Sequence, residues 1–464
     1  MASSPPELQA LGWSCRCPTP WRDRRHKRGA FRVTSDPLKP AGKASANRAE
    51  ALNQGCYCTT LDRERLAEAF DGEVGVKGFA RQLSVSHPTL FSNAAVFVPS
   101  AVLNAMMGII DAIETAERLP GYRAAALAKA PLIALRDFGP VGALMGYDFH
   151  ITPAGPQLIE VNTNAGGAFL NAVLARAQRT CCAAGDSPTE KATAATFSAN
   201  ILNMFLKEWS LQRGSGMPKL IAIVDDAPEQ QHLYPEFQLA KALLEQNGLE
   251  TVIADASRLT LESERLMIDR RPIDLVYNRL VDFGFDEPRH AALRIAYERG
   301  AVVVTPNPHV HAMLADKRNL ALLSDSERLS QWGLPANALI ALENGVPKTR
   351  VVSAEIADEL WRDRAGLFFK PARGHGSKAA YRGDKVTRRV WSEITAGDYV
   401  AQAYAPPSLR GISQAGERSK LKVDIRLYTY AGSLLIAAAR LYQGQTTNMR
   451  TRGGGFAPVL VVAE

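Results

Sequence analysis

The sequence has no run of about 18 consecutive apolar residues, so it offers no candidate for a transmembrane helix. Its first residues also lack the basic-then-apolar order of a secretory signal peptide. Both absences argue against a membrane-embedded or secreted protein. We expect a cytoplasmic protein with no membrane partner.

Cysteine is scarce. The six cysteines among 464 residues form three close pairs: Cys15/Cys17, Cys56/Cys58 and Cys181/Cys182. No secretory signal or regular spacing supports a disulfide framework. Two Cys-x-Cys pairs could supply a zinc site, but their spacing matches no known zinc finger. We expect reduced thiols.

Net positive charge is scarce outside the first 50 residues. Those residues hold ten Lys or Arg and four Asp or Glu, and therefore carry six of the eight net positive charges. The remaining chain is close to neutral, which argues against a nucleic-acid partner of the folded body. We interpret residues 1–50 as a disordered basic leader, or as extra sequence that results from a start codon assigned too early. A nucleic-acid or membrane contact and a transit peptide are the alternatives for this segment.

The rest of the chain divides into three parts by its hydrophobic pattern. Residues 51–215 contain apolar residues at helical spacing, interrupted by a strand-like hairpin near residues 147–162. Residues 216–310 alternate strand and helix, which predicts a doubly wound parallel sheet. Residues 311–464 mix helices, strands and a long hairpin. The fold class is therefore α/β combined with α+β.

The hairpin carries three hard ligands. Glu160 and Asn162 lie two apart on a strand, so their side chains share a face. A turn centred near Ala154, with a loop of odd length, would place Asp148 opposite Glu160. Carboxylate and amide oxygens suit Mg²⁺, which takes its remaining ligands from water and phosphates. This set predicts a nucleotide site, whereas the alternative is an exposed polar strand face.

A phosphate-binding loop of the Walker type is absent. In its place Lys370 ends a strand, and the short flexible loop that follows contains Gly374, Gly376 and Ser377. Such a loop can present backbone N–H groups to a triphosphate while the lysine contacts its oxygens. Lys317, which we expect inside a helix, is a second candidate cation, although a surface lysine is the simpler interpretation.

A third group is rich in arginine. Asp424 and Arg426 share one strand face, Arg440 lies on the return strand, and Asn448 and Arg450 precede a run of three glycines. Guanidinium groups stabilise charge on a transferring phosphoryl group or a tetrahedral adduct. We expect an anionic ligand here rather than a solvated surface.

These segments together resemble the ATP-grasp superfamily of carboxylate–amine ligases. "YDFHITPAGPQLIEVNTNAGG" resembles its metal-binding hairpin, and "LFFKPARGHGSK" resembles its Lys-Pro strand and glycine-rich loop. "ADKRNLALL" resembles the helix that carries its first ATP lysine, and "KVDIRLYTYAGSLLIAAARLYQGQTTNMRTRGGG" resembles its Asp-Ile-Arg and Gly-Gly segments. The resemblance implies ATP and Mg²⁺ as cofactors, with Gln402 and Tyr404 on the hinge strand beside adenine.

The order of these segments differs from that of most family members, because the Glu-x-Asn hairpin comes early. A circular permutation explains this order, and eukaryotic glutathione synthetases have it. That family has a metal-binding Glu four residues after the Lys of the Lys-Pro strand, where this sequence has Gly374. Asp148 fits the role of the third ligand. The resemblance places Arg279, in "VYNR", and Gly454 on the substrate side.

The resemblance implies a ligase that activates a carboxylate as an acylphosphate, which an amine then attacks. The ligase would act on an amino acid or a small peptide, and Arg426, Arg440 and Arg450 would steady the tetrahedral state. The alternative is an ATP-binding regulator or scaffold without ligase chemistry. Small molecules or peptides are the expected partners, and a homodimer is left open.

Deleting residues 1–50 separates the ligase from a nucleic-acid-binding module. We expect the shortened ligase to keep nearly all of its activity, because the predicted site lies entirely beyond residue 140. Steady-state activity of the two chains checks this. Complete loss of function in a folded, shortened chain would favour the basic leader as the working part.

Overall fold

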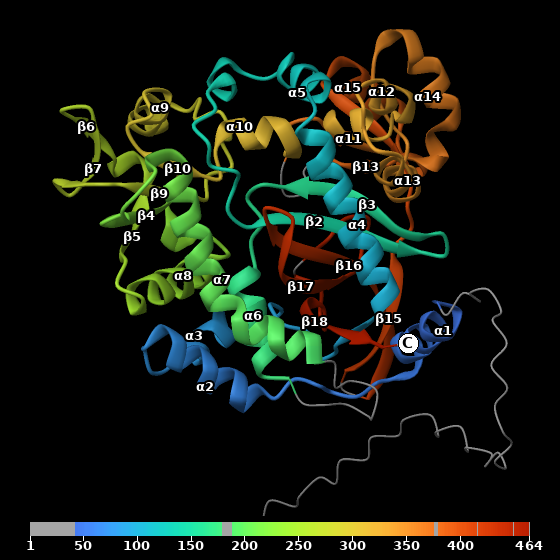
Figure 1. Ribbon diagram of the computed structural model, residues 1–464. Coiled ribbons are helices and arrows are strands. Elements are labelled where there is room, and N and C mark those ends of the chain that lie inside the picture. Colours follow the sequence, from blue (N-terminus) through green and yellow to red (C-terminus); the bar gives the residue numbers. More distant parts are fainter. Residues whose placement is uncertain (1–41, 179–187, 375–378, 415, 449, 464) are drawn as a thin grey trace, which may run out of the picture.

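The computed structural model describes residues 42–178, 188–374, 379–414, 416–448 and 450–463 (Figure 1). The predicted leader lies almost wholly outside these ranges. Helix α1 (Gly42–Gly55) crosses the predicted boundary at residue 50, and its Ala49 is buried. A deletion that ends at residue 41 therefore spares this helix. Cys56 is buried and Cys58 half-buried, whereas the other four cysteines lie outside the described residues.

The largest sheet has seven strands in the order β1-β18-β17-β16-β2-β3, with β15 also paired to β16. β1 runs parallel to β18 and the other pairs are antiparallel. The strands are β1 (Val96–Pro99), β2 (Met145–Thr152), β3 (Gly155–Asn162), β15 (Ser408–Gln414), β16 (Glu417–Tyr430), β17 (Ser433–Tyr442) and β18 (Gly455–Val462). The early β2–β3 hairpin thus lies beside strands from the end of the chain (Figure 1).

The predicted hairpin is confirmed, and Asp148 pairs with Glu160 as expected. The turn differs from the expectation. Thr152 pairs with Gly155, so the turn has only two residues, and a bulge between Asp148 and Phe149 on one side and Leu158 and Glu160 on the other restores the register. The extra residue in this bulge is Ile159, and a bulge of this kind commonly redirects groups beside an active site.

Strand alternation separates a core face from a polar face of this sheet. Odd-numbered residues such as Tyr147, Phe149, Ile425 and Leu427 enter the hydrophobic core beside α4 (Ser100–Glu117). The even-numbered residues of the same strands point to the opposite face. The polar residues of the hairpin therefore lie away from α4.

The predicted parallel sheet is confirmed, with the order β10-β9-β4-β5. Its strands are β4 (Leu220–Asp225), β5 (Glu250–Asp255), β9 (Leu275–Asn278) and β10 (Val303–Thr305). One face packs with α6 (Ala168–Arg176), α7 (Pro188–Arg213) and α8 (Tyr234–Gln246), and the other with α9 (Ala291–Glu298). A separate antiparallel sheet of three strands, in the order β6-β7-β8, contains β6 (Thr260–Glu262), β7 (Arg265–Ile268) and β8 (Arg271–Pro272).

A smaller antiparallel sheet has the order β11-β14-β12-β13, with α15 (Arg388–Ala396) and α14 (Ala357–Asp363) packed around it. Its strands are β11 (Thr349–Val351), β12 (Leu367–Pro371), β13 (Tyr381–Arg382) and β14 (Tyr399–Ala403). The remaining helices are α2 (Arg63–Val74), α3 (Phe79–Ser86), α5 (Pro120–Leu127), α10 (Pro308–Val310), α11 (Asn319–Leu323), α12 (Ser326–Gln331) and α13 (Ala336–Gly345).

The expected helix through Lys317 is wrong. A π-turn at His311–Ala315 ends before Asp316, and α11 begins only at Asn319, so Lys317 lies in a turn. Asp316 accepts the backbone N–H of Arg318 at 3.0 Å, which offers the backbone an alternative to a helical bond. The backbone N–H of Lys317 then donates to the carbonyl of Ala372 at 3.0 Å and fixes the turn against the small sheet.

Glu208 on α7 joins the two larger sheets. Its carboxylate accepts the backbone N–H groups of Val141 and Gly142, each at 3.0 Å, and the hydroxyl of Tyr430 at 2.9 Å. It also accepts a hydrogen bond from the hydroxyl of Thr305 at the end of β10.

None of the helices in the described part of the chain has the length and apolar character that a membrane span requires.

Candidate functional site

A cleft lies between the polar face of the large sheet and the small antiparallel sheet. It encloses about 930 Å³, including space open to solvent. The large sheet contributes β2, β3, β16 and β17, and the small sheet contributes β12 and β14. A volume of this size suits a small-molecule ligand. The cleft therefore brings together parts of the chain that are distant in sequence.

Glu160 and Asn162 line this cleft from β3. The Asn162 amide nitrogen lies 3.2 Å from a Glu160 carboxylate oxygen and 3.2 Å from an Asp148 oxygen. The Glu160 side chain keeps 29% of its surface exposed, so its carboxylate can contact a molecule or ion bound in the cleft. The two predicted oxygen ligands of β3 are thus adjacent and accessible.

The bulge at Ile159 holds one of the two predicted lysines. The Lys370 ammonium donates to the Ile159 carbonyl and to the Gln402 side-chain oxygen, both at 2.7 Å. Burial lowers the pKa of Lys370 to about 8, against an opposing effect from Glu160. Lys370 is therefore a positioned cation whose charge is lost at mildly alkaline pH.

Lys317 reaches the same place from the other side. Its ammonium donates to the Gly374 carbonyl at 2.7 Å and lies 3.8 Å from a Glu160 oxygen. Lys317, Lys370 and Gly374 all line the cleft. The predicted Gly376 and Ser377 lie outside the described residues.

Asp148 is buried beneath this surface in an ion network. Its oxygens accept from Arg426 Nε at 2.6 Å, Arg426 Nη2 at 2.7 Å and Arg440 Nη2 at 2.7 Å. Burial alone would raise the pKa of Asp148, but the two guanidinium charges hold that pKa well below its usual range. Both carboxylate oxygens of Asp148 are therefore hydrogen-bonded to arginine side chains.

Arg440 extends the network to a second acid. Its Nε donates to Asp424 at 2.6 Å, and the hydroxyl of Thr447 donates to the other oxygen of Asp424 at 2.5 Å. Asp424 pairs directly with Arg440 across β16 and β17, and Arg426 pairs with Asp148 across β16 and β2. Asp424 and Arg426, which the sequence predicted to share a strand face, thus belong to one ion network with Asp148 and Arg440.

The hinge residues form hydrogen bonds with other parts of the protein. Gln402 holds Lys370, and the N–H groups of Ala403 and Tyr404 donate to the carbonyls of Lys348 and Gly366, each at 2.8 Å. These two N–H groups are therefore engaged within the protein. The side chain of Tyr404 still lines the cleft.

Sequence reasoning did not assign several cleft residues to the site. The Nδ1–H of His150 donates to the Ala405 carbonyl at 2.7 Å, and its Nε2 lies 3.3 Å from the Tyr442 hydroxyl. Phe368 and Lys422 also line the cleft. The period of two could have found His150 from Asp148 and Phe368 from Lys370. The same period could have found Tyr442 from Arg440 and Lys422 from Asp424.

Three other predicted residues lie away from the described cleft lining. Asn448 and Arg450 are exposed, and the Asn448 side-chain oxygen accepts the Arg450 N–H at 2.9 Å, which stabilises a turn. Gly454 is buried beside a smaller polar hollow that also contains Ser92 and Gln414. A Cβ at Gly454 would lie 2.3 Å from the Leu441 carbonyl oxygen, so only glycine fits there.

Arg279 lies at the junction between the cleft hairpin and the parallel sheet. It is buried, its Nη1 donates to the Tyr277 hydroxyl at 3.2 Å, and its Nε has no hydrogen-bond partner in the structure. A Cβ on Gly166 would lie 3.2 Å from Arg279 Nη2 and 3.5 Å from a Glu236 oxygen. The absence of a side chain at Gly166 thus allows the loop after β3 to lie close to the buried side chains of Arg279 and Glu236.

Glu236 receives the N-terminal end of α6. Its carboxylate accepts the N–H of Phe169 at 3.3 Å and that of Gly167, and burial raises its pKa. Arg426 and Tyr428 reach the Gly166 carbonyl at 3.4 and 2.6 Å from the opposite side. The loop after β3 therefore connects the ion network to Arg279.

No protein-family model and no curated protein sequence matches this chain. Among solved structures, a glutathione synthetase-like effector from Globodera pallida matches with a TM-score of 0.53 and 12% identity, over 88% of this chain and 100% of that one. A gamma-glutamylcysteine synthetase-like protein from Methylobacillus flagellatus matches with a TM-score of 0.42 and 10% identity, over 76% and 85%. The ATP-grasp ligase PsnB, in complex with a precursor variant, Mg and ADP, has a TM-score of 0.30 and 16% identity, over 47% and 71%.

The chain has an ATP-grasp-type fold, as the sequence predicted. The likeness to the Globodera pallida protein is one of fold. The circular permutation and the domain boundaries stay predictions.

The ion network and the accessible carboxylate should respond differently to amide substitution. We expect Asp148→Asn to lower the free energy of unfolding by about 3–5 kcal/mol, because buried Arg426 loses its paired carboxylate and Arg440 keeps only Asp424. Glu160→Gln should change it by about 0.5 kcal/mol or less, because that side chain is partly exposed. Urea denaturation of both variants measures this, and equal losses would contradict the assignment.

Proposed function

We propose that this protein is an ATP- and Mg²⁺-dependent ligase that joins a carboxylate to an amine, in the manner of glutathione synthetase-like enzymes. The observation that carries the proposal is the convergence of Glu160, Asn162, Lys317 and Lys370 on one accessible cleft. Two oxygen ligands beside two ammonium groups suit a metal-bound triphosphate. The likeness in fold to a glutathione synthetase-like effector supports the same reaction class.

The donor set fits magnesium at Glu160 and Asn162. Both are oxygen donors on one strand face, and the Asn162 amide can present its oxygen to a cation after rotation about its terminal bond. Asp148 fits less well, because Arg426 and Arg440 already engage both its oxygens. We therefore propose that Asp148 positions these arginines, and that Glu160 and Asn162 are the protein ligands of the metal.

ATP with its metal supplies the phosphoryl group that activates the carboxylate, after which the amine displaces phosphate. Lys370 and Lys317 hold positive charge at the phosphate end of the cleft, and the Ile159 and Gly374 carbonyls fix their ammonium groups. Arg440 lines the cleft with its guanidinium oriented by Asp148 and Asp424. A cation fixed in advance stabilises developing negative charge without reorganisation.

The substrate carboxylate would approach from the side of Arg279. This guanidinium is buried, its Nε is unpaired in the structure, and the glycine pair at 166–167 brings the end of β3 to it. Arg450 and Gly454 lie outside the described cleft lining, so any contact of theirs with substrate requires a change in the 448–454 segment.

Glu160→Gln should lower turnover by roughly 100-fold or more with the fold intact, because a metal ligand loses its charge. The assay measures ADP release by wild type and variant with each amino acid or short peptide. Glu343→Gln, on the exposed face of α13, is the matched control and should keep full activity. ATP binding without any substrate-dependent ADP release would favour the regulatory alternative and contradict the ligase.

Nucleotide affinity should fall as pH rises through the pKa of Lys370. Because this pKa is about 8 in the free protein, a growing fraction of the lysine is neutral above pH 8, and binding phosphate must then take up a proton. We expect the dissociation constant for Mg-ATP to rise roughly tenfold per pH unit above that value. Calorimetric titration at several pH values measures it.

Lys370→Arg is the control for this pH dependence. A guanidinium stays protonated throughout the range, so the variant should bind with an affinity that is nearly independent of pH. Equal pH dependence in the variant and the wild type would show that another group titrates.

A further inference from the structure

A second group of ligand side chains lies at the carboxyl-terminal edge of the parallel sheet. Asp226 directly follows β4, and Glu287 and His290 lie in the segment between β9 and α9. β5 and β9 pair with opposite sides of β4, so the chain reverses its direction of winding at this edge. Crevices at such points commonly bind ligands in open α/β sheets.

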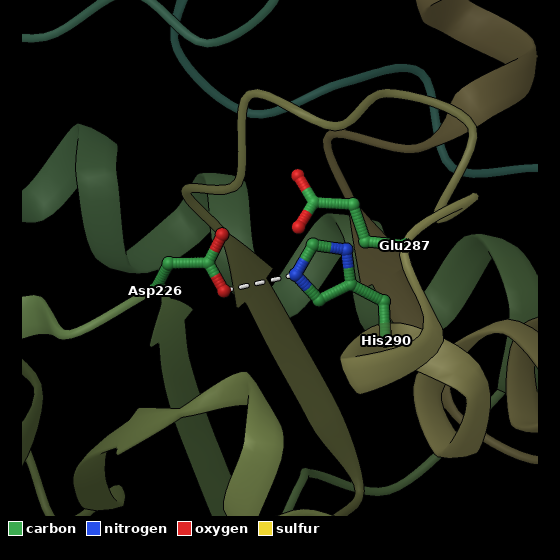
Figure 2. Close-up of side chains that lie close together, drawn as sticks. All are labelled: Asp226, Glu287 and His290. Carbon is green, nitrogen blue, oxygen red and sulfur yellow. Dashed lines mark hydrogen bonds and ion pairs between the residues drawn. The ribbon is translucent and has the colours of Figure 1, made fainter.

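The three side chains converge. One ligand atom from each of Asp226, Glu287 and His290 lies within 4.8 Å of the others. Figure 2 shows both carboxylates directed towards the same edge of the imidazole ring. His290 Nε2 lies 2.9 Å from an Asp226 oxygen. A cation placed between these groups could contact all three.

The imidazole distinguishes this group from an ordinary patch of surface acids. His290 is fully buried, and its Nδ1 lies 2.7 Å from an oxygen of Asp282, which is outside the converging set. The same Asp282 oxygen accepts the backbone N–H of Glu287 at 2.8 Å. A carboxylate that accepts Nδ1–H leaves Nε2 as the coordinating atom, which is the usual support of a metal-binding histidine.

Arg289 competes with a metal ion for the same oxygens. Its guanidinium lies 3.5 Å from Asp226 and also pairs with Glu287. Its side chain is 51% exposed, so solvent can take up the guanidinium when a metal ion displaces it. Three carboxylates (Asp226, Asp282 and Glu287) surround one guanidinium and one imidazole, which leaves net negative charge for a divalent cation to balance.

We propose that Asp226, Glu287 and His290 bind a divalent transition-metal ion such as Zn²⁺, Co²⁺ or Mn²⁺. One nitrogen and two carboxylates favour these ions over Mg²⁺, which prefers oxygen ligands alone. The ion would tie the segment after β9 to the end of β4. That segment begins with Arg279, so the metal would hold in place the loop on the proposed substrate side.

The experiment uses the full chain after treatment with a chelator, titrated with Zn²⁺ in a calorimeter. Glu160→Gln is the background, because it removes the proposed cleft metal site and isolates this one. We expect about one equivalent of bound Zn²⁺ in that background. Co²⁺ should give visible absorption bands typical of a nitrogen ligand. Absence of binding in the folded background variant would overturn the proposal, whether or not the protein proves to be a ligase.

Glu287→Gln is the test substitution, because its exposed side chain can change without disturbing the core. Added to the background, it should weaken Zn²⁺ binding roughly tenfold or more. Glu298→Gln, which removes a carboxylate paired with Arg294 on α9, is the matched control and should leave binding unchanged. Unchanged affinity in the Glu287 variant would assign the ion to other residues.

Arg289→Gln separates a metal site from a closed ion-pair cluster. If the guanidinium competes with the ion, its removal should raise the affinity for Zn²⁺ severalfold. An affinity that stays equal or falls would show that Arg289 supports the cluster instead, and would contradict a metal held by Asp226 and Glu287.

Discussion

The buried contact of Asp148 with Arg426 and Arg440 constrains the rest of the cleft. A carboxylate in this position is tolerated only because two guanidinium groups meet both of its oxygens. Those groups come from β16 and β17, so β2, β16 and β17 must be in register for the charges to balance. Glu160 stands beside Asp148 in that register, and its place in the cleft depends on the same pairing.

Two cations that face the cleft are held in position, Arg440 by this network and Lys370 by separate hydrogen bonds. Arg440 is oriented by two acids, and Lys370 by one carbonyl and one amide oxygen, so neither must reorganise to meet negative charge. The bulge at Ile159 positions two groups of the cleft, because it keeps Glu160 opposite Asp148 and turns the Ile159 carbonyl towards Lys370. One extra residue in β3 thus sets the positions of a carboxylate and an ammonium group.

Much of this was accessible from the sequence, and the failures have physical causes. Periods of two and of three to four residues predicted the hairpin, the parallel sheet and the shared face of Asp424 and Arg426, because these depend on local geometry. The turn at Lys317 depends on an Asp316 side chain that competes with a helix, and the direction of Arg450 depends on a turn closed by Asn448. Neither of these side-chain hydrogen bonds produces a periodic pattern in the sequence, so the hydrophobic pattern could not reveal them. The engagement of Asp148 by arginine required a pairing between residues 278 apart.

That separation has a consequence during synthesis. The β2–β3 hairpin leaves the ribosome long before β16, and at ~5–20 residues per second the interval between Asp148 and Arg426 is roughly 14–56 s. Throughout it the hairpin lacks its neighbouring strand, and the carboxylate of Asp148 stays hydrated because its counter-ions do not yet exist. The nascent chain therefore carries an open strand edge for most of its translation, a stage at which chaperones would be expected to bind it.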